Sequence, residues 1–286
     1  MNQLPHALIP SKTFLFGEYA ILADAPAVIL ATPPFFELIS CNKSSWHVDS
    51  AAAKILANSE QKYTLGQSDF KGLGLSGAEC IASWLHFTKQ PNINELIDMF
   101  KQNINYSASG ADIVCMWLGY CTDFTENSSK PWPFEELDIG IWATKTQIAT
   151  HTHLQTNPDV PAKLIACAKN CHTAWKTEDK NKIIEGINEY QAALVEANLQ
   201  LDSSSNLVAK ILQVPEVLAS KACGALGADI ILTISQTDSR QSIIDSVSSI
   251  GLTKIFVGNY VVPGIAQQWS HLQQSLEYEE KNAKRN

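Results

Sequence analysis

Three short stretches of this sequence combine residue types that bind phosphate groups. The first carries Lys12 in an apolar run before Gly17 and Glu18, and an ammonium beside a strand can neutralise phosphate oxygens. The second, residues 72–78, is rich in glycine and opens a helix, so its backbone can approach a phosphate closely while the helix N-terminus offers free N–H groups. The third, residues 224–229, is a tight loop before a strand.

Each stretch taken alone also has an ordinary structural interpretation. A Gly-x-Gly before a helix is usually a simple turn, and the loop at 224–228 could merely connect two elements. Lys12 could be a solvated residue at the edge of a strand. Asp112 follows a small-residue turn at 107–110, where it could cap the apolar helix predicted at 111–119.

In this order, the three stretches resemble the GHMP family of small-molecule kinases, which includes galactokinase, homoserine kinase, mevalonate kinase and phosphomevalonate kinase. The family pattern is a lysine with Gly-Glu, then Gly-Leu-Gly-Ser-Ser-Ala-Ala, then Lys-x-x-Gly-Ala-Gly-Gly-Gly. The matching residues are Lys12, Gly17, Glu18, Gly72, Leu73, Gly74, Ser76, Ala78, Lys221, Gly224, Ala225 and Gly227. The resemblance therefore covers most of the chain.

Shorter segments resemble the mevalonate branch of that family. Residues 17–22 read Gly-Glu-Tyr-Ala-Ile-Leu, with tyrosine for the usual histidine, as in bacterial phosphomevalonate kinases. Residues 109–113 resemble the Gly-Ser-x-Gly-Asp segment of those enzymes, and residues 142–151 resemble their Trp-Thr-Lys…Ser-Ser-His stretch. The resemblance thus implies a kinase that phosphorylates mevalonate or phosphomevalonate, in isoprenoid precursor synthesis.

The resemblance also implies a fold and cofactors. The expected class is α+β with two lobes, an N-terminal lobe at 1–137 like domain 2 of ribosomal protein S5 and a ferredoxin-like lobe at 138–286. ATP and Mg²⁺ are the expected cofactors. The residues that would bind the nucleotide phosphates are Gly72, Gly74, Ser76, Gly77 and Ala78, with Ser76 also contacting Mg²⁺.

Roles in the reaction follow from the same resemblance. Asp112 matches the base that accepts the proton of the substrate hydroxyl, and Lys12 matches the lysine that lowers the pKa of that base. Glu18 would serve either the substrate pocket or the structure, and the sequence leaves both open. The residues expected on the substrate side or in the closing loop are Glu18, Ser109, Gly110, Thr150, Gly224, Ala225 and Gly227.

Several positions depart from the family pattern. Leu75 replaces a serine, Gly77 replaces an alanine, and Leu226 and Ala228 stand where glycines are usual. The side chains of Leu75, Leu226 and Ala228 crowd loops whose backbone must approach a phosphate. The interval between the first two motifs is also short. Two alternatives to an active kinase therefore stay open: a catalytically impaired binding or regulatory protein with this fold, and a decarboxylase of the same superfamily.

Composition narrows the class of protein. The 286 residues include 21 Lys and Arg against 29 Asp and Glu, a net charge of −8, and 45% are apolar. This balance argues against a nucleic-acid partner, and no apolar run reaches the roughly 18 residues of a membrane helix. Seven scattered cysteines and the absence of a signal-peptide pattern favour a reduced, cytoplasmic protein, with a homodimer possible.

Strands and helices are mixed throughout the sequence, which predicts the α+β class. Pro33 and Pro34 are expected to end the second strand, and the polar segment 121–133 is interpreted as a domain boundary or an insertion loop. The predicted strands are 13–16, 27–32, 35–41, 138–144, 230–235 and 254–257, and the predicted helices include 161–176, 181–201, 207–212 and 215–221. A further helix is predicted after the glycine-rich stretch, because Ile81, Trp84 and Leu85 are spaced i, i+3, i+4 like a buried stripe. Metal sites at Cys167, Cys171 and His172, or at His151 and His153, are disfavoured because neither set supplies enough ligands.

Overall fold

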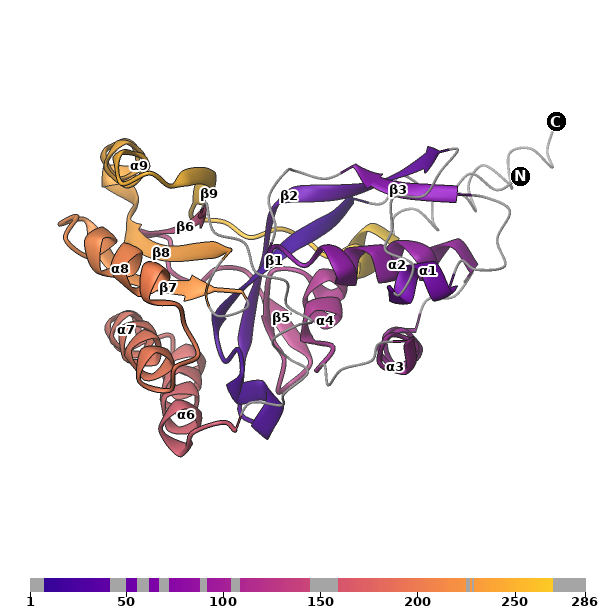
Figure 1. The fold of residues 1–286 in the computed structure, drawn as a ribbon, viewed down its shortest axis with the longest axis horizontal. Helices are drawn as coiled ribbons and strands as arrows, with labels where there is room; N and C mark the ends of the chain where they lie inside the picture. The colour runs from indigo at the N-terminus through magenta and orange to yellow at the C-terminus, as the bar shows by residue number, and fades with distance from the viewer. Residues whose placement is uncertain are drawn as a thin grey trace.

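A computed structural model of the chain describes residues 8–41, 50–55, 62–66, 72–87, 92–103, 109–144, 159–224, 227 and 229–269. Two antiparallel sheets with flanking helices lie side by side in it, one built mainly from the N-terminal half and one from the C-terminal half (Figure 1). The predicted α+β class with two lobes is therefore confirmed. None of the helices in these ranges is both long and apolar enough to cross a membrane.

The first sheet is organised around one long strand, β2. Its order is β1-β2-β4-β5, and β3 pairs with the far end of β2. The strands are β1 (Leu8–Phe16), β2 (Val28–Cys41), β3 (Lys62–Gly66), β4 (Cys121–Asp123) and β5 (Ser128–Lys130). A short 3₁₀ turn, η1 (Ala20–Ala23), follows β1 and returns the chain to the start of β2.

The expectation that Pro33 and Pro34 end a strand is wrong, because β2 runs through them. The pairing of β1 with β2 shifts at this point: Pro10 lies opposite Phe35, and Ser11 lies opposite Thr32. The two prolines therefore form a bulge, where the missing N–H groups break no ladder bond. The Ser11 hydroxyl donates to the carbonyl of Pro34 across the bulge, at 2.5 Å.

Helices cover one face of the first sheet. They are α1 (Ala51–Ile55), α2 (Leu75–Phe87), α3 (Ile93–Asn103) and α4 (Ala111–Leu118), with α2 and α4 against β1 and β2. The predicted apolar stripe of α2, formed by Ile81, Trp84 and Leu85, is buried. Trp84 meets Trp117 of α4 edge to face, with ring centroids 5.8 Å apart, so the two helices that border the candidate site pack directly on each other.

The second sheet has the order β7-β8-β6-β9. Its strands are β6 (Leu137–Ala143), β7 (Val217–Cys223), β8 (Ile230–Gln236) and β9 (Thr253–Gly258), and its helices are α6 (Ala162–Lys176), α7 (Lys180–Glu196), α8 (Asp202–Ile211) and α9 (Arg240–Ser249), the last preceded by the short turn η3 (Thr237–Ser239). Along the chain, β6 is followed by three helices, then by β7 and β8, and finally by α9 and β9. With the sheet order given above, this is the split β-α-β arrangement of ferredoxin-like folds. The ferredoxin-like lobe is therefore present as predicted.

Two other predicted elements differ from the structure. Residues 215–221 were expected to be helical, but 217–223 form β7, because pairing with β8 and burial outweigh helix propensity. The segment 121–133 is neither boundary nor insertion loop over residues 121–130. It forms the β4–β5 hairpin, which completes the first sheet next to β2.

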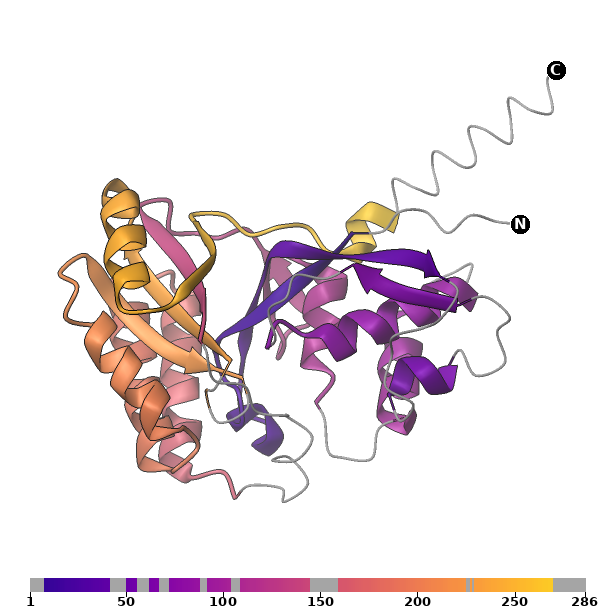
Figure 2. The same cartoon turned by 45° about the horizontal axis from the view of Figure 1, so that its top comes forward.

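The last described segment returns from the second sheet to the first, as Figure 2 shows in yellow. The Val262 N–H donates to the Ala31 carbonyl at 2.9 Å, and the Val262 carbonyl accepts from the Tyr120 N–H at 2.7 Å. One continuous apolar core includes residues of both sheets. The division of the chain after residue 137 stays a prediction; β6 begins at Leu137, and residues 262–269 pack with the N-terminal half.

Candidate active site

Lys12 and Asp112 meet between the first sheet and α4. The Lys12 Nζ lies 2.8 Å from Asp112 Oδ1, and the two side chains are 13% and 32% exposed. The same ammonium lies 5.0 Å from the ring centroid of Phe14, on the same face of β1. A charge pair with this partial exposure keeps a defined geometry while its carboxylate stays accessible from outside.

Local structure explains why Asp112 stands where it does. Gly110 adopts φ +80° as the N-cap of α4, and the Ala111 N–H donates to the Ser109 hydroxyl at 3.2 Å. Asp112 therefore lies in the first helical turn, where the helix dipole favours a negative charge. Ser109 and Gly110, predicted to lie on the substrate side, thus form the turn that positions Asp112.

The glycine-rich loop of residues 72–74 lies directly over Lys12. The Lys12 N–H donates to the Leu73 carbonyl at 3.0 Å. Gly74 has φ +94°, and a Cβ there would lie 2.9 Å from Lys12 Cγ and 2.4 Å from Met116 Cε. Glycine is required at this position on both counts, because any side chain would displace the lysine and strain the backbone.

The N-terminus of α2 lies beside Asp112. A Cβ on Gly77 would be 3.4 Å from Asp112 Cβ, so the first turn of α2 packs against the first turn of α4. Ser76 is exposed in that turn, whereas Ala78 is buried beneath it. The first N–H groups of a helix have no intrahelical partner, so this end of α2 offers anion-binding donors close to the carboxylate.

The third motif meets the second at Asp229. A Cβ on Gly72, which has φ +80°, would lie 2.5 Å from Asp229 Cβ, and one on Gly224, with φ +92°, would lie 2.9 Å from Asp229 Oδ2. The Gly227 N–H donates to the Gly224 carbonyl at 3.0 Å. Both glycine loops thus pack on one aspartate, which the sequence marked only as the end of a motif.

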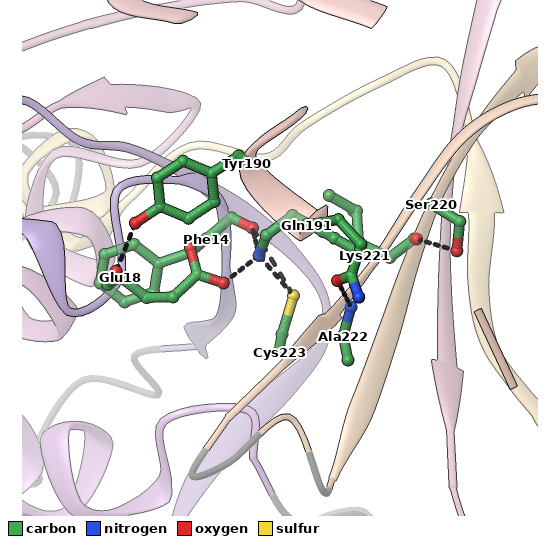
Figure 3. Close-up of polar contacts among 9 residues, drawn as sticks. Phe14, Glu18, Tyr190, Gln191, Ser220, Lys221, Ala222 and Cys223 are labelled. Atoms are coloured by element: carbon green, nitrogen blue, oxygen red, sulfur yellow. Dashed lines mark hydrogen bonds and ion pairs between the residues drawn. The ribbon is translucent and has the colours of Figure 1, made fainter. Parts of the chain in front are cut away.

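Glu18 belongs to the contact between the two sheets (Figure 3). Its carboxylate pairs with the ammonium of Lys221, whose side chain is fully buried, and its backbone carbonyl accepts from the Tyr190 hydroxyl. The Lys221 Nζ also lies 3.3 Å from the Phe14 carbonyl and 3.1 Å from Cys223 Sγ. Of the two roles left open for Glu18, this arrangement supports the structural one.

Burial and neighbouring charges determine the ionic states of Lys221 and Cys223. Burial alone would lower the pKa of the Lys221 ammonium, but its interactions with Cys223 and Glu18 outweigh burial, and the pKa is raised. Burial raises the pKa of the Cys223 thiol against the opposing effect of Lys221. Lys221 is therefore charged, and Cys223 is a neutral thiol at pH 7.

The structure brings together most of the residues singled out by sequence. Gly74 packs on Lys12, Gly77 packs on Asp112, and Lys12 pairs with Asp112, whereas Gly72 and Gly224 both pack on Asp229. Thr150 and Ala225 lie outside the described residues, as do Leu226 and Ala228. Lys221 was matched to the family pattern in the sequence but was assigned no role. Its position three residues before Gly224, in a buried strand, could have indicated a buried charge that needs a partner.

His172, one member of the disfavoured metal set, has a different partner. Its Nε2 lies 2.7 Å from Asp123 Oδ2, which joins α6 to the β4–β5 hairpin. Within the parts of the chain that the structure describes, no group of three or more His, Cys, Asp or Glu side chains is arranged to hold a metal ion.

Comparison with models of known protein families finds no match, and no curated protein matches significantly in sequence. Solved structures match in fold. Phosphomevalonate kinase of Streptococcus pneumoniae, in complex with phosphomevalonate and AMPPNP, has a TM-score of 0.69 at 16% identity over 89% of this chain and 99% of that chain. A mevalonate kinase has a TM-score of 0.68 at 13% identity, over 89% and 98%.

Galactokinase of Lactococcus lactis, in complex with galactose, matches as well, with a TM-score of 0.64 at 13% identity over 90% of this chain and 94% of that chain. All three proteins are kinases of the GHMP superfamily. The chain therefore has the GHMP kinase fold, which confirms the resemblance seen in the sequence at the level of the fold.

Proposed function

We propose that this protein is an ATP-dependent kinase that phosphorylates mevalonate or phosphomevalonate. The observation that carries the proposal is the contact of Lys12 Nζ with Asp112 Oδ1 at 2.8 Å, beside the first turn of α2. A partly exposed carboxylate, an ammonium and a helix N-terminus at one place are the groups that phosphoryl transfer needs for positioning and charge neutralisation. A cytoplasmic location and a homodimer belong to the same proposal.

The residues around α2 fit the phosphates of ATP. Gly72, Gly74 and Gly77 each stand where a side chain would fill the space next to Lys12, Asp112 or Asp229. With Ser76 and Ala78 they form a small-residue cradle at a helix N-terminus, where backbone N–H groups bind phosphate oxygens. The Lys12 ammonium adds a positive charge at the edge of this cradle.

The donor set also fits Mg²⁺ in the form that accompanies a nucleotide. Mg²⁺ prefers oxygen ligands and is usually held by one or two carboxylates together with phosphates and waters. The exposed Ser76, in the first turn of α2, offers such a ligand in its hydroxyl, which would bind the ion together with the phosphates and waters. The ion would neutralise the charge that develops on the phosphate oxygens.

Asp112 would accept the proton of the substrate hydroxyl as the new P–O bond forms and the bond to ADP breaks. Lys12 would stabilise the negative charges at this point and hold the carboxylate in place. Ser109 and Gly110 would fix the turn from which Asp112 projects. The choice of mevalonate or phosphomevalonate is supported by residues 109–113 and by the two solved kinases of that pathway with the same fold.

A coupled assay of ADP release with mevalonate, phosphomevalonate and diphosphomevalonate as acceptors tests the proposal. We expect turnover with one of the first two, and a loss of roughly 10²–10⁴-fold in Asp112→Asn, the usual contribution of a positioned base. Asp238→Asn, an exposed acid on η3, is the matched control and should keep full activity. Unchanged turnover in Asp112→Asn would refute the assignment of the base.

The two alternatives give different outcomes in the same experiment. Release of CO₂ together with ADP from diphosphomevalonate would identify a decarboxylase. Binding of phosphomevalonate or Mg·AMPPNP by calorimetry, without ADP release from any acceptor, would identify a binding or regulatory protein.

A further inference from the structure

The buried ammonium of Lys221 joins the two sheets at the point where each carries part of the candidate site. Its side chain is 0% exposed, and its Nζ contacts the Glu18 carboxylate, the Phe14 carbonyl and Cys223 Sγ. An ammonium has three donors, so these three contacts satisfy it completely. A buried charge is costly unless it is paired and hydrogen-bonded, so the arrangement requires all of its members.

Two of these partners belong to the first sheet. Phe14 lies two residues after Lys12 on β1, and Glu18 lies in the turn that follows β1. On the other side, Gly224 follows Lys221 by three residues and packs on Asp229. The ammonium therefore connects the strand of Lys12 to the strand that leads into the third motif.

Helix α7 holds both sides of this connection with two consecutive residues. The Tyr190 hydroxyl donates to the backbone carbonyl of Glu18, and the Gln191 side-chain carbonyl accepts from the Ala222 N–H at 3.0 Å. Figure 3 shows these bonds on either side of the Lys221 ammonium. The charge of Lys12 also reaches this group, since it opposes the rise in the pKa of the Cys223 thiol.

Directional bonds at this point do something that apolar packing would not. Apolar side chains could fill the same space with equal or greater stability, but they offer no directional bonds. Two acceptors of the ammonium, the Glu18 carboxylate and the Phe14 carbonyl, lie across the contact and fix its position relative to β1. A misplacement of about 1 Å in a phosphoryl-transfer site can cost on the order of 10²-fold in rate, so this position matters for function.

We propose that Lys221 and Glu18 are positioning residues, whose buried ion pair holds the end of β7, and with it Gly224, against β1, the strand that carries Lys12. The effect on catalysis rests on the proposed kinase function, whereas the effect on the end of β7 does not. Lys221 and Glu18 need not touch nucleotide or substrate for this role.

The test uses Glu18→Gln and the double variant Glu18→Gln/Lys221→Met. The double variant removes both charges and keeps side chains of similar length. Arg240→Met is the matched control, because it breaks another ion pair with a buried carboxylate, that of Asp138, at the opposite end of the second sheet. Hydrogen exchange of the amides at 222–230 is measured in each folded variant, together with KM for ATP and kcat. Thermal unfolding monitors the overall stability of each variant.

We expect exchange at 222–230 to accelerate at least about tenfold in both Glu18 variants relative to Arg240→Met, and KM for ATP to rise at least about tenfold. The single variant Glu18→Gln keeps a hydrogen-bond acceptor for Lys221. It therefore still tests the proposal if the double variant does not fold. Exchange at 222–230 that is no faster than in Arg240→Met overturns the proposal. Faster exchange in a protein that releases no ADP with any acceptor supports the positioning role and refutes the kinase.

Discussion

Glu79 offers a direct test of how burial acts on a charge near the candidate site. It lies on α2, one turn after Ser76, and desolvation by burial raises the pKa of its carboxyl from 4.5 to about 7. A carboxyl with a raised pKa in the folded state favours folding below its unfolded pKa and loses that contribution as pH rises through the folded value. The charged form of Glu79 therefore destabilises the protein between pH 4.5 and pH 7 and above.

The difference of 7 − 4.5 = 2.5 pKa units sets the size of the effect. At about 1.36 kcal/mol per unit, the penalty approaches 3 kcal/mol at pH 8 and is about 1 kcal/mol at pH 5. Glu79→Gln keeps the shape of the side chain and does not titrate. We expect this variant to be more stable than the parent by roughly 3 kcal/mol at pH 8 and roughly 1 kcal/mol at pH 5.

Urea unfolding of parent and variant at pH 5 and pH 8 measures this difference. Comparing the two proteins at each pH removes the contribution of every other titrating group. Glu185→Gln, an exposed acid on α7, controls for the loss of one negative charge and should change stability by less than about 0.5 kcal/mol at either pH. A stabilisation by Glu79→Gln that is the same at both pH values would refute the argument from burial.

Three further outcomes are expected. Gly119→Ala places a Cβ 1.9 Å from the backbone nitrogen of Gly264 and should lower the free energy of unfolding by more than about 3 kcal/mol. Gly251→Ala, whose Cβ has nothing within 4 Å, should lower it by about 1 kcal/mol because of the positive φ alone. Thermal unfolding compares the two variants. Arg240→Met leaves the carboxylate of Asp138 buried without its cation and should lower the free energy of unfolding in urea by about 3 kcal/mol. Lys163→Met breaks an exposed ion pair and should lower it by less than about 1 kcal/mol. Gly74→Ala displaces Lys12 and should lower kcat/KM on the order of 10²-fold in the ADP-release assay; an unchanged value would mean that the position of Lys12 does not limit the reaction.

Local patterns in the sequence were sufficient where the cause of structure is itself local. The spacing of Ile81, Trp84 and Leu85 predicted α2, and the glycines of 72–74 predicted a turn that the structure shows at positive φ. Both features depend on residues within a few positions of one another. The order of the three motifs predicted the fold in another way, through its resemblance to the GHMP kinase family.

Partners that are far apart in the chain were decided only by the tertiary structure. Residues 217–223 have the composition of a helix and form a strand because β8 is beside them, and Pro33 and Pro34 stay within β2 because β1 shifts register opposite them. Glu18 gained its buried partner from Lys221, 203 positions further along the chain. Pairing, burial and ionic contact depend on which surfaces meet after the chain has folded, and no pattern within a single segment carries that information.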